Sequence, residues 1–417
     1  MIPRNMQLHQ LHYGWIIVLT GTLCTIAGLG FGRFALGMLL PSMAVTLKLD
    51  YSQMGFISTG NFIGYLASVF LSGYIIARLG QRKLIFITLS LVGLSMVLVS
   101  RATSFQQVLL LYIITGIGSG GANISMMSLV SPWFTTANRG KAAGFMTIGS
   151  GFAIIFAGMF IPLVNRQYGS EGWRGSWLFL GTLVIFIATA CLLLLRNKPA
   201  DVGLKPYGDD ESPAVPHQGA AGRNVKMHKN RFVYHLGAIY FLFGYTYVIY
   251  ATFIVTALVK ERGFSETLAG NFWAWIGFLS LFSGPVFGTI ADKLSRRTGM
   301  MLAFTFHCLS YLLVASRLPG SFLYLSIFFY GVVAWSIPTI MAASIGDFVG
   351  PEDIAKAFGF ITFIFGLGQI TGPSLAGLLA QKSGSFSSSF YMAASFAFAA
   401  IILSAFLKKP GMTENIL

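Results

Sequence analysis

The stretch Gly30-Phe-Gly-Arg-Phe34 puts an arginine inside an apolar run that begins near Trp15 and continues to about Pro41. Of all the Lys, Arg, Asp and Glu residues, Arg33 lies most clearly inside such a run. A charge at mid-membrane depth costs about 2.5–3.5 kcal/mol on insertion scales, so it normally faces a watery cavity or pairs with another group. We therefore expect Arg33 to line a transport pathway and to bind an anion. The alternative is that it lies at the outer mouth, because it comes about 19 residues after Gly14.

The composition is that of a membrane protein. Hydrophobic residues make up 55% of the 417 residues, charged residues only 10%, and the mean hydropathy is +0.72. A soluble domain carries about 25% charged residues. A chain in lipid must satisfy its backbone hydrogen bonds internally, and the apolar runs here are continuous rather than alternating. The sequence therefore predicts an all-α membrane protein and not a β-barrel.

Twelve apolar segments are long enough to cross a bilayer, which takes about 20 mostly apolar residues. We expect them at residues 14–42, 52–78, 83–100, 105–130, 141–165, 175–196, 232–259, 266–291, 299–316, 320–346, 354–381 and 386–408. The longest polar interruption, residues 196–231, lies in the middle of the chain and contains four prolines. The sequence therefore predicts two six-helix halves, residues 1–195 and 232–417, joined by a flexible cytoplasmic linker at 196–231.

The positive charges predict the orientation in the membrane. With a cytoplasmic N-terminus, 19 of the 28 Lys and Arg residues lie in cytoplasmic segments and 8 in outer loops, while Arg33 lies in the membrane. Because Lys and Arg are enriched in cytoplasmic loops, we expect both termini to be cytoplasmic. The net charge of +15 is then a topology signal and a match for anionic lipid, rather than a sign of nucleic-acid binding.

Two short loops at equivalent points of the two halves share a glycine followed by a basic cluster. The residues concerned are Gly73, Arg78, Gly80 and Arg82 in the first loop, and Gly288, Asp292, Arg296 and Arg297 in the second. The pattern resembles the signature of the major facilitator superfamily, G-x-x-x-D-[RK]-x-G-R-[RK]. That resemblance implies a gating role for these residues through a charge relay with nearby helix ends. Since Ala77 stands where the first copy usually has its acid, Asp292 with Arg296 or Arg297 is the better candidate relay.

Further segments resemble two branches of that superfamily. Segments similar to bacterial carriers of the oxalate/formate and monocarboxylate type are His12–Val18, Trp133-Phe134 with Arg139–Gly144, Gly172-Trp-Arg174 and Pro199–Pro206. Segments similar to a second branch, poorly characterised bacterial facilitators, are Gly32–Phe34 with Leu39–Pro41, and Phe365–Gln369 with Gly372-Pro373. Both branches contain carriers of small organic solutes. The eighth segment lacks the Asp and Arg that proton-coupled monocarboxylate carriers often hold, so the coupling ion stays open.

By the same resemblance, the substrate site lies near the bilayer midplane between the halves, lined by the first, fourth, seventh and tenth helices. A guanidinium offers a planar fork of donors that suits a carboxylate. Buried phenols want hydrogen-bond partners, and the offsets of seven and three residues put three tyrosines of the seventh helix near one face. The candidate substrate-binding residues are Arg33, Asn61, Asn123, Tyr240, Tyr247, Tyr250, Asn271, Trp275, Trp335 and Gln369. For the aromatic and amide residues the alternative is packing between helices.

These observations predict a secondary transporter that moves a small, monocarboxylate-like organic anion across the cytoplasmic (inner) membrane by rocking of its two halves. No Asp or Glu lies clearly in mid-helix, which argues against a cationic substrate. We expect a monomer in the lipid bilayer that binds a small-molecule substrate, with a proton or a counter-anion as the coupling ion. No catalytic set, metal-spaced cluster or cofactor motif is recognisable, so we expect no enzyme activity, metal or cofactor. The alternatives are an exporter of drug-like or apolar molecules and, from another class, a non-transporting membrane sensor.

Overall fold

The computed structural model describes residues 12–208, 231–316, 318–348 and 353–407. Every regular element in this part of the chain is a helix, which confirms the predicted all-α class. The first group of helices is α1 (Tyr13–Thr25), the π-helix η1 (Ile26–Phe34), α2 (Ala35–Thr46), α3 (Tyr51–Leu79), α4 (Gln81–Val99), α5 (Phe105–Trp133), α6 (Thr136–Thr147), α7 (Gly149–Tyr168), the short η2 (Gly169–Glu171), α8 (Gly172–Leu194) and the short η3 (Pro199–Val202). The second group is α9 (Arg231–Thr256), the π-helix η5 (Ala257–Glu261), α10 (Glu266–Lys293), α11 (Arg296–Ala315), α12 (Ser321–Val333), α13 (Ser336–Phe348), α14 (Ile354–Ser383) and α15 (Ser387–Ala405).

Eleven helical stretches of the described residues are long and apolar enough to cross a membrane. One of them, Thr136–Leu194, holds 59 residues and contains α6, α7 and α8. Each predicted apolar segment coincides with one helix, or with helices in direct succession, to within five residues at either end. The hydrophobic runs therefore located the helices well.

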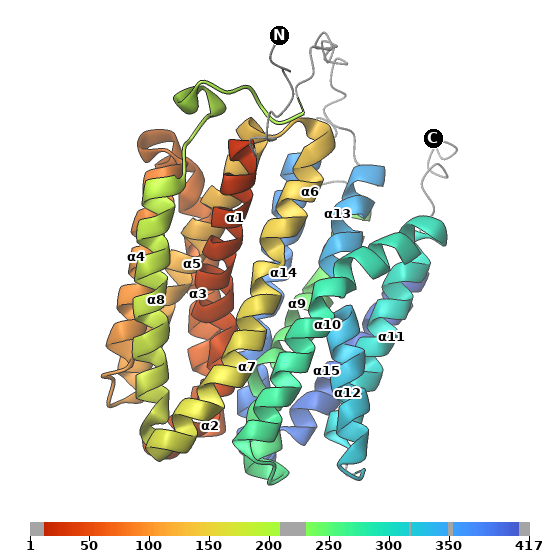
Figure 1. The fold of residues 1–417 in the computed structure, drawn as a ribbon. Coiled ribbons are helices and arrows are strands. Elements are labelled where there is room, and N and C mark those ends of the chain that lie inside the picture. Colours follow the sequence, from red (N-terminus) through yellow and green to blue (C-terminus); the bar gives the residue numbers. More distant parts are fainter. Residues whose placement is uncertain (1–11, 209–230, 317, 349–352, 408–417) are drawn as a thin grey trace, which may run out of the picture.

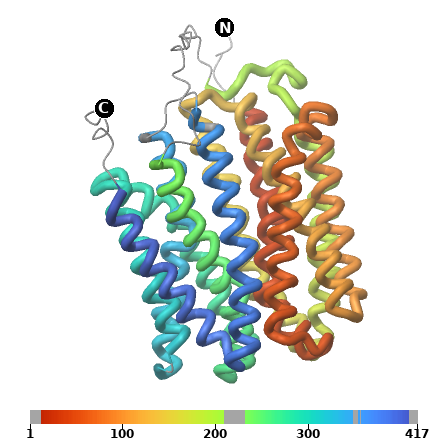
Figure 2. Tube along the Cα trace, turned by 180° about the vertical axis from the view of Figure 1, so that it is seen from behind, coloured from red at the N-terminus to blue at the C-terminus, as the bar shows by residue number. Residues whose placement is uncertain are grey.

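The two groups of helices lie side by side. Figure 1 shows α1–α8, in red to yellow-green, on one side and α9–α15, in green to blue, on the other, and the reverse view in Figure 2 agrees. The first residue of α1 and the last residue of α15 lie at the same end of the bundle, which we call the terminal face. The opposite end, where α2 ends and α3 begins, we call the far face.

Helix packing follows this division. In the first group α3 packs on α5, and α4 packs on both α5 and α8; in the second group α9 packs on α14, and α11 packs on α12 and α15. Among the described residues, most of the packing between the groups comes from three helix pairs, namely α3 with α14, α7 with α10, and α2 with α9. These pairs make up the main part of the interface between the groups.

Glycines let the backbones of α7 and α10 meet across this interface. A Cβ added to Gly270 would lie 2.3 Å from the carbonyl oxygen of Gly158, and a Cβ on Gly158 would lie 2.5 Å from that of Gly270. Small residues of this kind allow helices in membranes to approach closely. Gly140 and Gly144 of α6, toward the terminal face, have no atom within 4 Å of a Cβ position. The close contacts between α7 and α10 continue from Gly158 and Gly270 to Gly151 and Gly277, since a Cβ added to Gly277 would lie 2.8 Å from the Gly151 carbonyl.

Polar contacts also join the groups near the far face. The Nδ2 atom of Asn165, near the end of α7, donates to Oε2 of Glu266 at the start of α10, at 2.7 Å. The backbone N–H of Tyr51 donates to Oε1 of Gln381 at 3.0 Å, which connects α3 to α14. Both bonds lie at helix ends, where polar groups can reach the interface without entering the apolar interior.

The beginning of the expected linker is held against the terminal face. The backbone N–H of Tyr207 donates to the carbonyl of Trp133 at 2.9 Å, and that of Thr135 donates to the carbonyl of Tyr207 at 3.2 Å. The imidazole of His12 bonds the carbonyl of Lys205 at 3.1 Å. The linker expected at residues 196–231 is thus anchored to the first group as far as Tyr207, while residues 209–230 lie outside the described residues.

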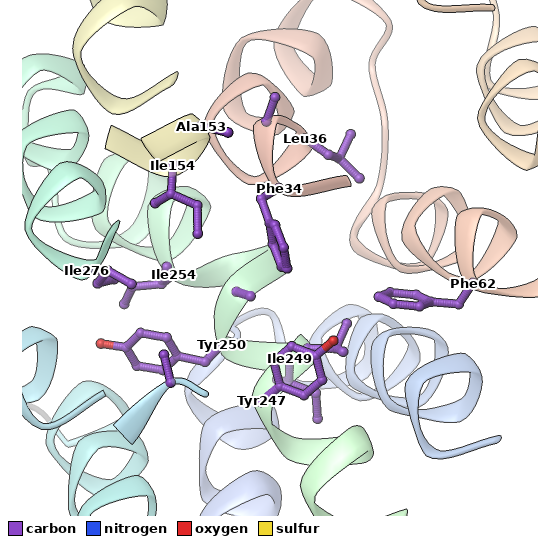
Figure 3. Close-up of a cluster of buried hydrophobic side chains, with 14 of the residues drawn as sticks. Phe34, Leu36, Phe62, Ala153, Ile154, Tyr247, Ile249, Tyr250, Ile254 and Ile276 are labelled. Carbon is purple, nitrogen blue, oxygen red and sulfur yellow. The ribbon is translucent and has the colours of Figure 1, made fainter. Parts of the chain in front are cut away.

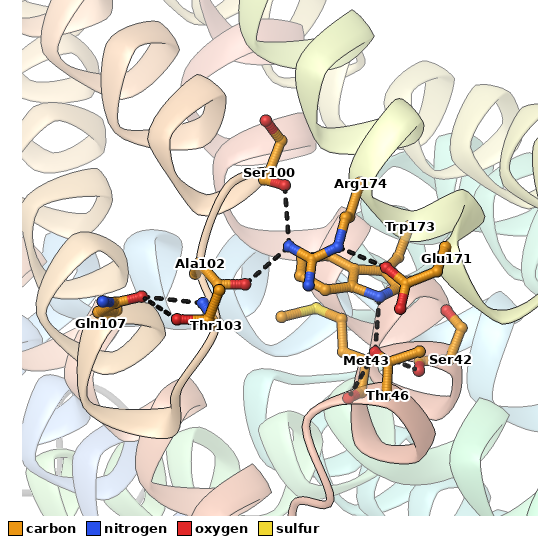
Figure 4. A network of polar contacts seen from close by, with 10 residues as sticks. All are labelled: Ser42, Met43, Thr46, Ser100, Ala102, Thr103, Gln107, Glu171, Trp173 and Arg174. Carbon is orange, nitrogen blue, oxygen red and sulfur yellow. Dashed lines mark hydrogen bonds and ion pairs between the residues drawn. The ribbon is translucent and has the colours of Figure 1, made fainter.

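A second network orders the far face, where Gly172-Trp-Arg174 starts α8. Nη1 of Arg174 donates to the carbonyls of Ser100 and Ala102 at 3.1 and 2.7 Å, and the same guanidinium pairs with Glu171 (Figure 4). The indole of Trp173 donates to Oγ1 of Thr46 at 2.8 Å. This segment therefore ties the start of α8 to the ends of α2 and α4.

Candidate functional site

A small cavity, with room for about one water molecule, lies where η1, α2, α3 and α5 meet α9. Both groups of helices contribute to its wall, so the cavity lies at their interface. Figure 3 shows Phe34 from η1, Phe62 from α3 and Tyr247 from α9 gathered in this region. The lining residues are Arg33, Phe34, Leu36, Gly37, Ser58, Asn61, Phe62, Tyr112, Tyr247, Val248, Ala251 and Thr252.

Arg33 reaches this cavity from the π-helix η1, a type of segment that is frequent at functional sites. Its guanidinium carbon lies 4.5 Å from the centre of the Phe62 ring and 4.3 Å from the centre of the Tyr65 ring. The faces of such rings attract cations. Nε and Nη2 of Arg33 are buried and have no hydrogen-bond partner among the described residues. The rings therefore hold the charge in place while two strong donors remain free for a ligand.

Helix α5 supports the π-helix from behind. The hydroxyl of Tyr112 donates to the carbonyl of Arg33 at 3.0 Å, and the hydroxyl of Ser119 donates to the carbonyl of Gly28 at 2.7 Å. In a π-helix the backbone hydrogen bonds span five residues instead of four, which changes the pairing of the backbone groups. Buried carbonyls nevertheless need hydrogen-bond partners. These two side chains provide hydrogen-bond donors for backbone carbonyls of η1. They thereby fix the position of η1 relative to α5, and with it the position of the Arg33 side chain.

Asn61 of α3 lies beside the arginine and is only 1% exposed. Its Nδ2 atom donates to the carbonyls of Gly32 and Tyr112 at 3.2 and 3.3 Å. Its Oδ1 atom is buried and has no partner in the described part of the chain. The amide thus joins η1, α3 and α5, and leaves an acceptor unpaired in the wall of the cavity.

The opposite wall comes from α9, supported by α14. The hydroxyl of Tyr247 accepts a hydrogen bond from Nε2 of Gln369 at 2.5 Å. The hydroxyls of Ser58 on α3 and Thr252 on α9 bond each other at 3.1 Å across the interface. Polar groups on both sides of the interface therefore surround the same small space.

Most of the expected site residues lie in or next to the cavity. Arg33, Asn61 and Tyr247 line it directly. Gln369 and Trp335 lie one residue behind the wall, Gln369 on Tyr247 and Trp335 with its ring centre 5.4 Å from that of Phe34. Asn123 and Tyr240 lie two residues behind it: Nδ2 of Asn123 donates to the Tyr65 hydroxyl at 2.9 Å, and the ring of Tyr240 stacks on Phe365 at 4.2 Å.

Three expected residues are not in the cavity. Tyr250 points into the second group of helices, where its hydroxyl bonds that of Ser326 at 2.9 Å, so the offset of three residues from Tyr247 did not keep them on one wall (Figure 3). Asn271 and Trp275 are exposed on α10. The sequence showed polar and aromatic residues on this helix but not its rotation. Trp273, two residues from each, is the one buried toward α2, against Gly37.

The prediction missed four contributors, Ser58, Phe62, Tyr65 and Thr252. Asn61, Phe62 and Tyr65 come three, four and seven residues after Ser58, which places all four on one face of a helix. That spacing is visible in the sequence and could have identified the α3 wall. Thr252 could not be found this way, since its place depends on how α9 meets α3.

The expected gating residues lie at the terminal face. Arg296 pairs with Asp292 and, at 2.7 Å from its Nε, with Asp347, so it links α10, α11 and α13. In the first group Arg82 donates from Nε to the carbonyl of Leu192 at 2.7 Å. The remaining members are an exposed Arg297, Arg78 stacked on Tyr74, Gly80 with a φ of 74°, and Gly73, around which no atom lies within 4 Å of a Cβ position. Their gating role stays a prediction.

Acidic groups are absent from the cavity wall. Each Asp or Glu of the described residues lies at a helix end or in a connecting segment, and no group of His, Cys, Asp or Glu in that part of the chain could hold a metal ion. The free donors of Arg33 therefore have no internal counter-ion in the wall. Such a cavity attracts anions and repels cations.

The family follows from a comparison with known proteins. A family model described as "Uncharacterised MFS-type transporter YbfB" matches residues 25–405. The chain belongs to this family. The resemblance to the major facilitator superfamily expected from the two loops is therefore confirmed, and the chain is a transporter-family membrane protein.

Curated relatives of this transporter match along most of their length. It is 25% identical to the hexuronate transporter of Bacillus subtilis, over 92% of this chain and 93% of the relative. It is 21% identical to the probable sulfoacetate transporter SauU of Cupriavidus necator, over 88% of each chain. It is 23% identical to monocarboxylate transporter 2 of Homo sapiens, over 90% of this chain and 81% of the relative. All three are named as transporters and none as an enzyme.

Solved structures share the fold. A bacterial homologue of the human lysosomal transporter Spinster, in an inward-facing and unoccupied conformation, superposes with a TM-score of 0.72 at 15% identity over 95% of this chain and 96% of that chain. The nucleoside transporter NupG superposes with a TM-score of 0.71 at 17% identity over 94% of this chain and 99% of that chain. At these identities the likeness concerns the fold alone.

Proposed function

We propose that this chain is a secondary transporter of small, monocarboxylate-like organic anions that works by alternating access. The observation that carries the proposal is the position of Arg33, in a cavity between the two groups of helices, with two unpartnered donors held between aromatic rings. A guanidinium cannot lose its proton and matches a carboxylate with paired donors. The relatives named above support the same class, since hexuronate, sulfoacetate and monocarboxylates are all organic anions.

The proposed topology has twelve crossings, formed by two halves, residues 1–195 and 232–417. The 59-residue stretch counts as two crossings because the chain turns at Gly169, which has a φ of 64°, and α8 then packs back on α7. An even number of crossings also agrees with α1 starting and α15 ending at one face. We assign that face to the cytoplasm of the inner membrane, because most Lys and Arg residues lie on it.

In the proposed cycle the halves rock about the Arg33 cavity. The tight contacts of α7 with α10 and of α3 with α14 close the far face, and the relay of Asp292, Arg296 and Asp347 acts at the terminal face. A substrate anion bound at Arg33 would contact both halves, since Tyr247 belongs to the second. Bound substrate would therefore favour closure of the two halves around it. The transporter is proposed to act as a monomer, with a proton or a counter-anion as the coupling ion.

The test is uptake of a panel of radiolabelled solutes into proteoliposomes, with and without a pH gradient. We expect saturable uptake of at least one small carboxylate, its loss in Arg33→Ala, and its retention in Arg101→Ala, which removes an exposed arginine of the α4–α5 loop. Normal uptake by correctly inserted Arg33→Ala would overturn the anion site. Export of uncharged or apolar compounds instead would favour the alternative function, an exporter of drug-like molecules. The aromatic side chains of the cavity wall are the observation that favours this alternative. Tight binding without any flux would favour a sensor.

A further inference from the structure

The orientation of the Asn61 amide is fixed by its partners. Nδ2 donates to the carbonyls of Gly32 and Tyr112, and both of these oxygens can only accept. Turning the amide over would place Oδ1 against two carbonyl oxygens and lose both bonds. Oδ1 is therefore the end of Asn61 that has no partner, on a residue that lines the cavity.

An unpaired acceptor in this place needs a donor. A buried polar atom without a hydrogen bond is costly, and an isolated one in a native structure calls for an explanation. The neighbouring donor on α5 is already used, because the hydroxyl of Tyr112 donates to the carbonyl of Arg33. Arg33 itself is stacked between Phe62 and Tyr65, and its free donors do not reach Asn61.

The cavity thus presents unpaired donors and an unpaired acceptor that do not satisfy each other. A third group can take part, because the oxygen of Tyr247 already accepts from Gln369 and its own hydrogen is left to donate. A ligand that satisfies all of these needs an anionic group for Arg33 and a hydroxyl nearby. The hydroxyl would donate to Oδ1 of Asn61 and accept from Tyr247.

We propose that Asn61 is a specificity-determining residue that selects hydroxylated carboxylates, such as 2-hydroxy acids and sugar acids, over their alkyl and 2-oxo analogues. Alkyl and 2-oxo acids are ionised at neutral pH and carry no donor for Oδ1. The inference rests on the proposed anion transport, because it needs the carboxylate to bind Arg33. Sites that hydrogen-bond a substrate hydroxyl reject analogues that lack it, since the polar groups are then left unpaired.

The first experiment uses the unmodified protein and matched pairs of acids. Binding of acetate against glycolate, and of propionate and pyruvate against 2-hydroxypropionate and 3-hydroxypropionate, is measured by competition in proteoliposomes. We expect at least one hydroxylated acid to bind about tenfold or more tightly than its partner. Equal affinities within every pair, in a protein that binds at least one acid, would overturn the role of Asn61 and leave the anion site standing. Failure of all the acids to bind would overturn the anion site itself.

The second experiment uses the ratio of affinities as an internal readout. We expect Asn61→Ala to remove the difference in affinity between the hydroxylated acid and its deoxy partner, while loss of the bonds to Gly32 and Tyr112 weakens the binding of both acids alike. The matched control is Asn138→Ala, which removes an amide that bonds only Thr135 at the start of α6 and should keep the ratio. An unchanged ratio in Asn61→Ala would overturn the proposal. If Asn61→Ala does not fold, the comparison of the matched acids on the unmodified protein tests the proposal.

Discussion

The guanidinium carbon of Arg33 lies 4.3 Å from the centre of the Tyr65 ring, and the Tyr65 hydroxyl is itself held by Nδ2 of Asn123. A residue of α5 thereby orients a ring of α3, and that ring positions a charge of η1. Three helices of the first group contribute to the placement of one side chain. The consequences can be tested separately for the ring, the charge and the surrounding packing.

Replacing Tyr65 by Leu should weaken anion binding much more than Tyr65→Phe, which keeps the ring face under Arg33 and loses only its orienting bond from Asn123. Leu removes the ring face under Arg33, and a cation–π contact in a desolvated site is worth roughly 1–2 kcal/mol, so the apparent KM should rise about 5- to 30-fold. Uptake kinetics of the two variants provide the measurement. Equal KM values for Leu and Phe would show that the ring does not position Arg33.

Replacing Arg33 by Lys should leave weak transport. The ammonium keeps the charge but loses the planar fork and the stacking between two rings, so we expect the apparent KM to rise by about tenfold or more. Uptake is measured at increasing substrate concentration. A raised KM leaves the maximal rate of uptake close to that of the unmodified protein, whereas a loss of folded protein lowers the maximal rate. A Lys variant with an unchanged KM would mean that only net charge matters at this position.

Replacing Gly270 by Val should block transport by preventing closure at the far face. Even one carbon added there would lie 2.3 Å from the Gly158 carbonyl, so α7 and α10 must separate. Overpacking of this kind costs about 1–3 kcal/mol, and we expect a lower melting temperature together with loss of uptake. Gly140→Ala, at a position with open space, is the control and should behave as the unmodified protein. Full uptake by Gly270→Val would exclude a tight α7–α10 contact in the cycle.

Replacing Asp347 by Asn should change transport rate more than stability. Its ion pair with Arg296 is partly exposed, and exposed pairs contribute about 1 kcal/mol or less to stability. The pair nevertheless joins α11 to α13, so its loss should alter the rate of substrate exchange several-fold. Asp292→Asn removes the other partner, and the double variant should not be additive because both acids share Arg296. Additive effects would show that the two acids act independently.

Replacing Arg174 by Ala should destabilise the protein without changing its substrate affinity. The side chain bonds two carbonyls at the end of α4, pairs with Glu171 and stacks on Trp173 at 4.2 Å. Leaving those carbonyls without a partner costs about 1–3 kcal/mol, which should lower the melting temperature. The KM of the folded fraction should stay the same, because this network lies outside the cavity lining. A large change in KM would indicate that the far-face network reaches the site.

The sequence was sufficient to predict the helices and the family. Continuous apolar runs set the helix positions to within a few residues, and the two basic loops identified the superfamily. Arg33 could be identified from the sequence because a charged side chain within an apolar helix needs water or a polar partner, whatever the packing of that helix. Its neighbours could be predicted only in part, through the spacing of Ser58, Asn61, Phe62 and Tyr65 on one helix face.

Helix rotation, which composition does not set, explains why three of the expected residues lie away from the cavity. Asn271 and Trp275 looked like cavity residues because they are polar or amphipathic, yet the buried face of α10 carries Trp273 and Gly277. That face is chosen by the glycines that meet α7, a contact between segments more than a hundred residues apart. Tyr250 lies away from the cavity because its hydroxyl forms a hydrogen bond with Ser326 of α12, inside the second group.

The π-helix η1 has a consequence for the register of the first helix. A π-segment of this kind takes up one extra residue within the helix, and each residue turns a helix by about 100°. Before η1, Gly21 contacts Met146 of the first group; after it, Gly37 meets the Ala251 carbonyl of the second. Deleting one residue between Ile26 and Phe34, other than Arg33, would shorten the helix by only one residue and keep its hydropathy and the arginine, but would turn α2 away from α9. The number of residues in η1, and not only their types, therefore decides which group of helices α2 contacts.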